Sequence, residues 1–238
     1  MHLVADTHTH TLSSGHAYST LGEMVKAAAD IGLAAIAITD HGPAMPAGAH
    51  RFHFQNSRVW PQTLYSVRLL RGAEVNITDG KGVLDLSEEV LAELELNIAS
   101  IHPPTYIGSV DKADVTRATL SAMGSPYIHV IGHPDDSRYP VDFSEIARAA
   151  ADTGTLLEVN NSSLRPGSFR ENTRDNCVEM LAQCEKYGAM VTAASDAHID
   201  LEVGNFHFCL QVLAETGFPA KLVANTSLEK LLSALGQK

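Results

Sequence analysis

The sequence predicts an α/β protein built around a parallel sheet that is either open or closed. Short apolar runs alternate with helical segments along the 238 residues, and these runs show little polar alternation. Strands buried on both faces have this pattern, and helical crossovers between them make neighbouring strands parallel. A chain of this length that is 45% hydrophobic can form one substantial core. We therefore expect one domain over residues 1–238.

Seven apolar runs are the predicted strands. They are residues 3–6, 34–39, 68–75, 97–100, 128–132, 156–160 and 190–195. A further run at 221–225 ("KLVAN") is a candidate for a short late strand. Residues 42–56 are rich in Pro, Gly and His, which predicts a long loop.

The predicted helices have readable starts. Thr20 and Glu23 form a capping-box pattern ahead of an apolar stripe, and Gly32 follows as a stop. The same cap-and-acid pattern recurs in two pairs, Asp85 with Glu88 and Asp142 with Glu145. Further helices are predicted at 111–122, 171–187, 204–216 and 227–235.

The charge balance argues against a nucleic-acid or membrane partner. The formal net charge is 17 − 28 = −11, and no basic run occurs anywhere in the chain. A surface of this sign repels phosphate backbones and anionic lipids. An anionic substrate would therefore need a local positive centre.

The cysteine content and the N-terminal sequence both indicate the cellular compartment in which the protein is expected. Cys177, Cys184 and Cys209 are an odd number without a disulfide framework, and the first two are predicted buried free thiols. The N-terminus has no apolar signal core, and the longest apolar stretch, "IGLAAIAI", is too short to span a bilayer. We expect a soluble cytoplasmic protein.

Potential metal ligands follow the predicted strands. The stretch "DTHTH" places two histidines on one side of an extended chain, and similar residues recur after every later strand. Because the carboxyl ends of strands in β/α folds meet at one rim, these side chains are expected to converge on a metal site. They are His8, His10, Asp40, His41, Glu74, His102, His133, Asn160, Asn161, Asp196 and His198.

Other polar residues near the predicted rim leave two interpretations open. Asp6 and Asp40 flank ligand candidates and either orient an imidazole or make ordinary loop hydrogen bonds. Arg165 and Arg170 either clamp an anionic substrate or remain solvated, and Arg165 is the substrate-binding candidate. Ordinary structural roles are expected for the remaining histidines, of which His53 alone is a weak candidate for a substrate contact: His2, His50, His53, His129 and His207.

The motifs "DTHTH", "ITDHG", "GAEVN", "SIHPP", "IGHP" and "SDAH", in this order, resemble those of the PHP (polymerase and histidinol phosphatase) superfamily. "HAYSTLGEM" and "ITDHGPAM" are similar to the stand-alone YcdX-like probable phosphatases of that superfamily. The resemblance covers essentially the whole chain. It implies a distorted (β/α)7 barrel with the metal site at the C-terminal rim of the strands.

The resemblance also implies nine ligands for three divalent ions, which would be Zn²⁺, with Mn²⁺ or Fe²⁺ as alternatives. The first ion would bind His8, His10, Glu74 and Asp196; the second would share Glu74 and add His102 and His133; the third would bind His16, His41 and His198. Three divalent ions and two carboxylates would leave a charge of about +4 at the rim, which suits a phosphate dianion.

The function implied is hydrolysis of the phosphate monoester of a small metabolite. No protein nucleophile is expected, because a hydroxide held by the metal ions would attack phosphorus. The resemblance further implies a homo-oligomer, for which a trimer is the candidate.

Three alternatives remain. An amidohydrolase-type barrel that cleaves a C–N bond also begins with His-x-His, but it typically carries a metal-bridging lysine where this chain has "SIHPP". A phosphodiesterase or exonuclease activity is a second alternative. A non-catalytic metal-stabilised interaction module is the third, and it would tolerate loss of ligands.

Overall fold

Seven parallel strands form a nearly closed barrel in the computed structural model, which describes residues 1–236. They follow one another around the sheet in chain order and are β1 (Ala5–Asp6), β2 (Ala35–Ile38), β4 (Val67–Asn76), β5 (Leu96–Ser100), β6 (Val130–Ile131), β7 (Leu156–Asn160) and β8 (Val191–Ala194). The predicted distorted (β/α)7 barrel is confirmed. A short strand that was not predicted, β3 (Thr63–Leu64), pairs antiparallel with β4.

The seam between β8 and β1 is closed by two different devices. Near the rim, Thr9 and Ala197 form an isolated parallel bridge. Lower down, the buried Asn225 side chain donates from Nδ2 to the carbonyl oxygens of Ala5 and Ala193, at 2.8 and 2.7 Å. The side chain thus replaces missing ladder hydrogen bonds between the first and last strands.

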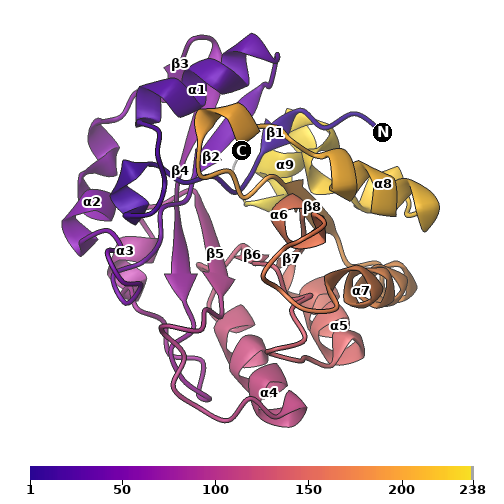
Figure 1. Cartoon of the computed structure of the whole chain (residues 1–238). Helices are drawn as coiled ribbons and strands as arrows, with labels where there is room; N and C mark the ends of the chain where they lie inside the picture. The colour runs from indigo at the N-terminus through magenta and orange to yellow at the C-terminus, as the bar shows by residue number, and fades with distance from the viewer. Residues whose placement is uncertain (237–238) are drawn as a thin grey trace.

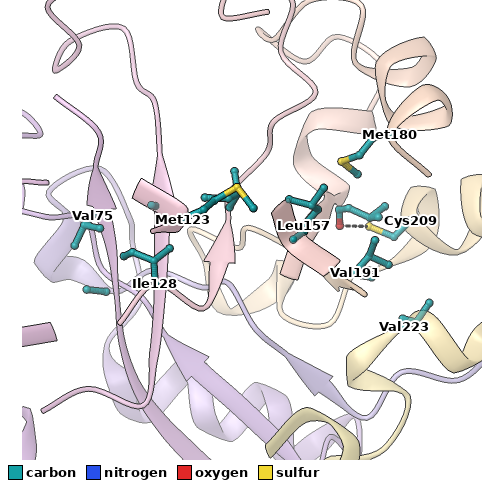
Figure 2. Close-up of a cluster of buried hydrophobic side chains, with 14 of the residues drawn as sticks. Val75, Met123, Ile128, Leu157, Met180, Val191, Cys209 and Val223 are labelled. Carbon is teal, nitrogen blue, oxygen red and sulfur yellow. Dashed lines mark hydrogen bonds between the residues drawn. The ribbon is translucent and has the colours of Figure 1, made fainter. Parts of the chain in front are cut away.

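Helices surround the strands, as Figure 1 shows. They are α1 (Leu21–Asp30), α2 (Arg51–Asn56), α3 (Glu88–Leu91), α4 (Lys112–Met123), α5 (Phe143–Thr153), α6 (Asn161–Leu164), α7 (Thr173–Tyr187), α8 (His207–Glu215) and α9 (Leu228–Ala234). Figure 2 shows strand residues such as Leu157 and Val191 packed with Met180 and Cys209 from α7 and α8. Of the helices in residues 1–236, none is long and apolar enough to cross a membrane.

The barrel interior holds a second apolar cluster. It contains Leu70, Leu96, Val130 and Leu156, which lie toward the amino ends of their strands or at their first residues. Leu231 from α9 belongs to the same cluster, so this helix closes the N-terminal end of the barrel. Because strand side chains alternate between faces, the residues that continue this inner face toward the other end include Glu74 and Asn76.

Most predicted helix starts are confirmed, and one is wrong. Thr20 and Glu23 form the capping box of α1, and Asp142 accepts from the backbone nitrogens of Ser144 and Glu145. Asp85 does not cap α3, whose N-cap residue is Ser87. Asp85 instead accepts from the backbone nitrogens of Ala44 and Asn76. Its carboxylate therefore joins the loop after β2 to the end of β4.

Two further predictions are wrong in part. Residues 221–225 form two short 3-10 turns, Ala220–Leu222 and Ala224–Thr226, and only Val223 makes a strand-like bridge, with Val191. The predicted loop at 42–56 contains α2 at its end, where His50 accepts from the backbone nitrogen of Phe52. The side-chain cap lets a helix form in a segment whose composition is typical of a loop.

The three cysteines are buried free thiols, as predicted for Cys177 and Cys184. Burial raises the pKa of Cys184 to about 12 and raises the pKa of Cys177 and Cys209 as well. All three thiols therefore stay protonated and unreactive at neutral pH.

Candidate metal centre

The structure brings all nine predicted ligands together at the C-terminal rim of the barrel. Neighbouring imidazoles form a continuous group, with ring centroids 5.0 Å apart for His8 and His10, 4.3 Å for His10 and His41, and 4.7 Å for His16 and His198. Residues from distant parts of the sequence meet here because most of them lie in, or directly follow, the carboxyl ends of the parallel strands β1, β2, β4, β5, β6 and β8.

Glu74 lies at the centre of the group. Its Oε2 atom is 2.7 Å from His41 Nδ1 and 3.3 Å from His8 Nε2. Its Oε1 atom is 3.0 Å from His133 Nε2 and 3.3 Å from His102 Nε2. Burial alone would raise the pKa of this glutamate, but the surrounding imidazoles, led by His8, lower it well below the usual range.

Asp196 approaches the same group from β8. Its Oδ1 atom lies 3.4 Å from His10 Nε2 and 3.6 Å from His8 Nε2. Its Oδ2 atom accepts from Arg170 at 3.2 Å and from Asn160 at 3.2 Å. One carboxylate oxygen is thus held by the protein, and the other faces the imidazoles.

Several nitrogen and oxygen atoms that could bind a metal ion are buried at the centre without a hydrogen-bond partner. Among the described residues these include His8 Nε2, His10 Nε2, His41 Nδ1 and Glu74 Oε2. A buried polar atom without a partner is costly and calls for an explanation. Imidazole nitrogens and carboxylate oxygens are the donor atoms that divalent transition metals take, so this donor set fits bound metal ions.

Three groups within the described residues have donor atoms that lie within 4.8 Å of one another and could hold an ion. They are His8, His10 and Glu74; His10, His41 and His198; and His41, Glu74 and His102. These groups share members, because His10, His41 and Glu74 each belong to two of them. The ring centroid of His10 lies 4.3 Å from that of His41 and 4.2 Å from that of His198, and His16 Nε2 lies 3.0 Å from His198 Nε2.

In two of the imidazole rings, a neighbouring side chain holds the nitrogen that points away from Glu74. His8 Nδ1 lies 2.7 Å from Glu158 Oε1, and His102 Nδ1 lies 2.8 Å from Asn76 Oδ1. These contacts turn the Nε2 atoms of both rings toward Glu74. The sequence analysis missed both partners, although Glu158 has a signal: it is the one charged residue in the apolar strand "LLEVN".

Asp6 and Asp40 have different roles. Asp6 accepts from the backbone nitrogens of Ser195 and Gly204, so it makes the ordinary loop hydrogen bonds that were one of its two interpretations. Asp40 accepts from Ser14, whose hydroxyl lies 3.1 Å from His10 Nδ1, so it acts on an imidazole through a hydroxyl. Burial would raise the pKa of Asp40, but hydrogen bonding, chiefly to His53, lowers it to about 2.

Two residues of the cluster have strained backbone. His133 and Asp196 have φ angles of 29° and 58°, a region that side chains with a Cβ rarely adopt. Each is held in place by its own backbone nitrogen: that of His133 donates to Glu158 Oε2 at 2.6 Å, and that of Asp196 donates to the carbonyl oxygen of His8 at 3.0 Å. Such strain persists where the surroundings fix it, and it is common at functional sites.

A cavity of about 730 Å³ opens over the cluster. Arg165 and Arg170 both line it, but they differ in burial and in their contacts. The Arg170 side chain is buried and bound to Asp196, whereas the Arg165 side chain is 55% exposed and lies 3.9 Å from Glu202. His53 contacts Asp40 instead and is not among the described residues that line this cavity.

Of the remaining histidines, His50 and His129 have structural roles, and His2 and His207 are exposed. His50 caps α2, and His129 Nδ1 accepts from the backbone nitrogen of Asn97 at 3.0 Å. His207 is the exposed first residue of α8. These positions agree with the roles expected from the sequence.

The barrel and the histidine-rich rim define a class, the β/α barrels with a metal-binding centre at the carboxyl ends of the strands. Residues 6–201 match the PHP domain model, and the chain belongs to the PHP family. It is 43% identical over 230 residues to a protein of Acetivibrio thermocellus named as a probable phosphatase, with 97% of this chain and 94% of the relative covered. A similarly named protein of Edwardsiella ictaluri is 41% identical over 233 residues, with 98% and 94% covered.

Solved structures share the fold at low sequence identity. The chain is similar to the histidinol phosphate phosphatase of Lactococcus lactis in complex with zinc, L-histidinol and phosphate, with a TM-score of 0.62, 17% identity, and 90% and 94% of the two chains covered. It is also similar to an amidohydrolase, with a TM-score of 0.51, 11% identity, and 99% and 74% covered. Likenesses at these identities establish the fold alone.

Proposed function

We propose that this protein is a metal-dependent phosphatase that hydrolyses phosphate monoesters of small metabolites. The observation that carries the proposal is the rim cluster. It buries potential ligand atoms that have no hydrogen-bond partner, and its outer members, His41 and Asp196 among them, line a cavity large enough for a metabolite. The relatives named as probable phosphatases support it. The complex of a PHP-type neighbour with zinc and phosphate gives further support.

We assign three divalent ions to the cluster, with Zn²⁺ favoured by the imidazole donors and Mn²⁺ or Fe²⁺ as alternatives. The first would bind His8, His10, Glu74 and Asp196; the second would bind Glu74, His102 and His133; the third would bind His16, His41 and His198. Bound ions would supply Lewis acidity and a nucleophile at neutral pH. Their charge minus that of two carboxylates, about +4, would hold the phosphate of a substrate against the acidic surface.

The chain's own residues orient this centre and the substrate. The low pKa of Glu74 keeps its carboxylate ionised, and Glu158 holds the His8 ring with Nε2 toward the centre. Arg170 holds one oxygen of Asp196 and leaves the other directed at His8 and His10. Arg165 lines the cavity and its side chain is 55% exposed, so we assign it to substrate binding.

Phosphate release from 4-nitrophenyl phosphate by metal-loaded protein tests the reaction. We expect turnover that is abolished by a chelator and inhibited by free phosphate. His41→Ala should lower turnover about a hundredfold, since it removes a proposed ligand. His207→Ala, a change of the same residue type on the exposed surface of α8, should have no effect.

Other outcomes would favour the alternative reactions. Faster cleavage of bis(4-nitrophenyl) phosphate than of the monoester would indicate a phosphodiesterase. Hydrolysis of cyclic ureides without phosphate release would indicate C–N chemistry. A stable protein with bound metal and no activity on any of these compounds would favour an interaction module.

The proposal also covers the domain content and the oligomeric state of the protein. We propose a single barrel domain over residues 1–238 that forms a homo-oligomer, with a trimer as the candidate. Size-exclusion chromatography with light scattering tests this, since a monomer mass of 25.5 kDa at micromolar concentration would contradict it.

A further inference from the structure

The cavity over the metal centre is much larger than a phosphate group requires. Its volume is about 730 Å³, within the range of pockets that enclose whole metabolites. Beyond the cluster, its lining is largely apolar and comes from four separate loops. These residues, here called the apolar wall, are Met45, Pro46, Pro103, Pro104, Phe169 and Ile199.

Phe169 supplies the aromatic ring of this wall. Its side chain is 67% exposed, and the guanidinium carbons of Arg138 and Arg170 lie 5.2 and 5.0 Å from its ring centroid. Both guanidinium groups are themselves fixed, Arg138 by Asp136 and Arg170 by Asp196. The ring is therefore held in place beside the cavity, where a flat ligand could stack on it without ordering a mobile side chain.

The charged side chains beside the apolar wall carry little net charge, in contrast to the metal centre. Arg138 pairs with Asp136 at 2.6 Å, and Arg170 pairs with Asp196 at 3.2 Å. Arg165 lies 3.9 Å from Glu202, which also lines the cavity. Two of the three cations, Arg138 and Arg165, thus lie beside carboxylates that do not belong to the metal centre, so a second anionic group on a substrate would gain little attraction from them.

We propose that the apolar wall is a leaving-group subsite for an uncharged aromatic group. This rests on the proposed function and specifies its substrate class as phosphate monoesters of alcohols that carry a flat apolar ring. Proline rings and Phe169 offer faces for stacking, whereas the hydroxyls of a polyol would lose hydrogen bonds with water against such a wall. In the reaction, water adds to phosphorus as the ester P–O bond breaks, and the leaving oxygen gains the proton that water loses.

Three primary alkyl phosphates test the subsite in the metal-loaded, full-length protein. Benzyl phosphate, glycerol 3-phosphate and 4-carboxybenzyl phosphate all leave as primary alkoxides, so their intrinsic reactivities are similar. We expect kcat/KM for benzyl phosphate to exceed that for glycerol 3-phosphate by about tenfold or more. The added carboxylate should lower kcat/KM again by about tenfold, because a charge is placed against an apolar surface.

Two phenylalanine variants locate the effect. Phe169→Ala should reduce the ratio of kcat/KM for benzyl phosphate to that for glycerol 3-phosphate by about two- to tenfold. Phe52→Ala is the matched control: its ring is 59% exposed and lies 5.2 Å from the Arg51 guanidinium carbon, but it is on α2 away from the cavity. This variant should keep the wild-type ratio.

The outcomes separate the two proposals. Equal kcat/KM for benzyl and glycerol phosphates, or a preference for the carboxylate, would overturn the subsite while leaving the phosphatase intact. A wild-type ratio in Phe169→Ala would overturn the role of the apolar wall. No phosphate release from any of the three esters would contradict the proposed function itself.

Discussion

The two ends of the barrel interior are built from the same strands but in opposite ways. On β4, Leu70 and Glu74 are four residues apart and share the inner face. Leu70 packs in a cluster with Leu96, Val130 and Leu156. Glu74 is equally buried, but it is surrounded by imidazoles and has an oxygen without a hydrogen-bond partner.

This difference shows how a barrel separates stability from chemistry. The lower end is closed by α9 and gains stability chiefly from apolar burial. The upper end buries donor atoms whose cost is offset only when something binds them. Changes at the lower end should therefore affect folding, and changes at the upper end should affect metal binding and turnover.

The largest effect is expected from Glu74→Ala. The substitution removes the carboxylate that faces five imidazoles, so mutual repulsion between bound ions would no longer be screened. Turnover should fall by on the order of a thousandfold or more, and metal content should drop by about two ions per chain. Elemental analysis and steady-state kinetics, with folding checked by circular dichroism, provide the measurement. Wild-type metal content in this variant would show that Glu74 is not a bridging ligand.

Leu70→Ala is the matched change at the other end of the same strand face. It should lower the free energy of unfolding by about 2–5 kcal/mol, because it leaves a cavity in a fully buried cluster. Metal content and kcat below the melting transition should stay close to wild type. Urea unfolding monitored by circular dichroism measures the first effect. Loss of metal without loss of stability would contradict the separation of the two ends.

A smaller effect is expected from Glu158→Gln. The carboxylate that contacts His8 Nδ1 becomes a neutral amide, which should weaken metal affinity about 10- to 100-fold. Excess metal should restore most of the activity, which a folding defect would not allow. Titration with Zn²⁺ or Mn²⁺ during turnover measures this. The control is Glu229→Gln at the exposed start of α9, where the metal dependence should not change.

The smallest effect concerns pH and His129, which lies outside the cluster. Burial lowers its pKa from 6.5 to about 4, so the unfolded chain takes up the proton first as pH falls. The stability linked to this residue is therefore complete above about pH 6.5 and is lost as pH falls toward 4. His129→Asn keeps an acceptor for the backbone nitrogen of Asn97 but does not titrate.

Between pH 7 and pH 5, the wild type should lose about 1–2 kcal/mol more free energy of unfolding than His129→Asn. Urea unfolding of both proteins at the two pH values measures the difference, and metal effects common to both cancel. Equal losses would show that His129 is not protonated preferentially in the unfolded chain.

The rim could be predicted from the sequence because its chemistry is local to strand ends. Wherever a buried parallel strand ends, the next residues reach the same edge, so residues as distant as His8 and Asp196 could be grouped without a structure. The family resemblance added His16, which follows no strand directly. The division of the nine residues into three ligand sets also comes from the resemblance, and it stays a prediction.

The partners of the ligands were harder to predict. Glu158 and Asn76 lie within strands, and their roles depend on which face they share with the cluster and on the register of neighbouring strands. The helix at Arg51–Asn56 was missed because a His cap replaced the usual Ser or Asp. Residues 221–225 were misassigned because their apolar pattern reflects packing of 3-10 turns beneath the barrel, not strand pairing.

The metal content of gently purified, zinc- or manganese-reconstituted protein tests the central claim most directly. We assign nine ligands to three ions at the upper end of the barrel, where potential ligand atoms are buried without hydrogen-bond partners. This assignment predicts close to three ions per chain by elemental analysis. One ion or fewer per chain would contradict the claim that this end of the barrel is built to hold a trinuclear centre.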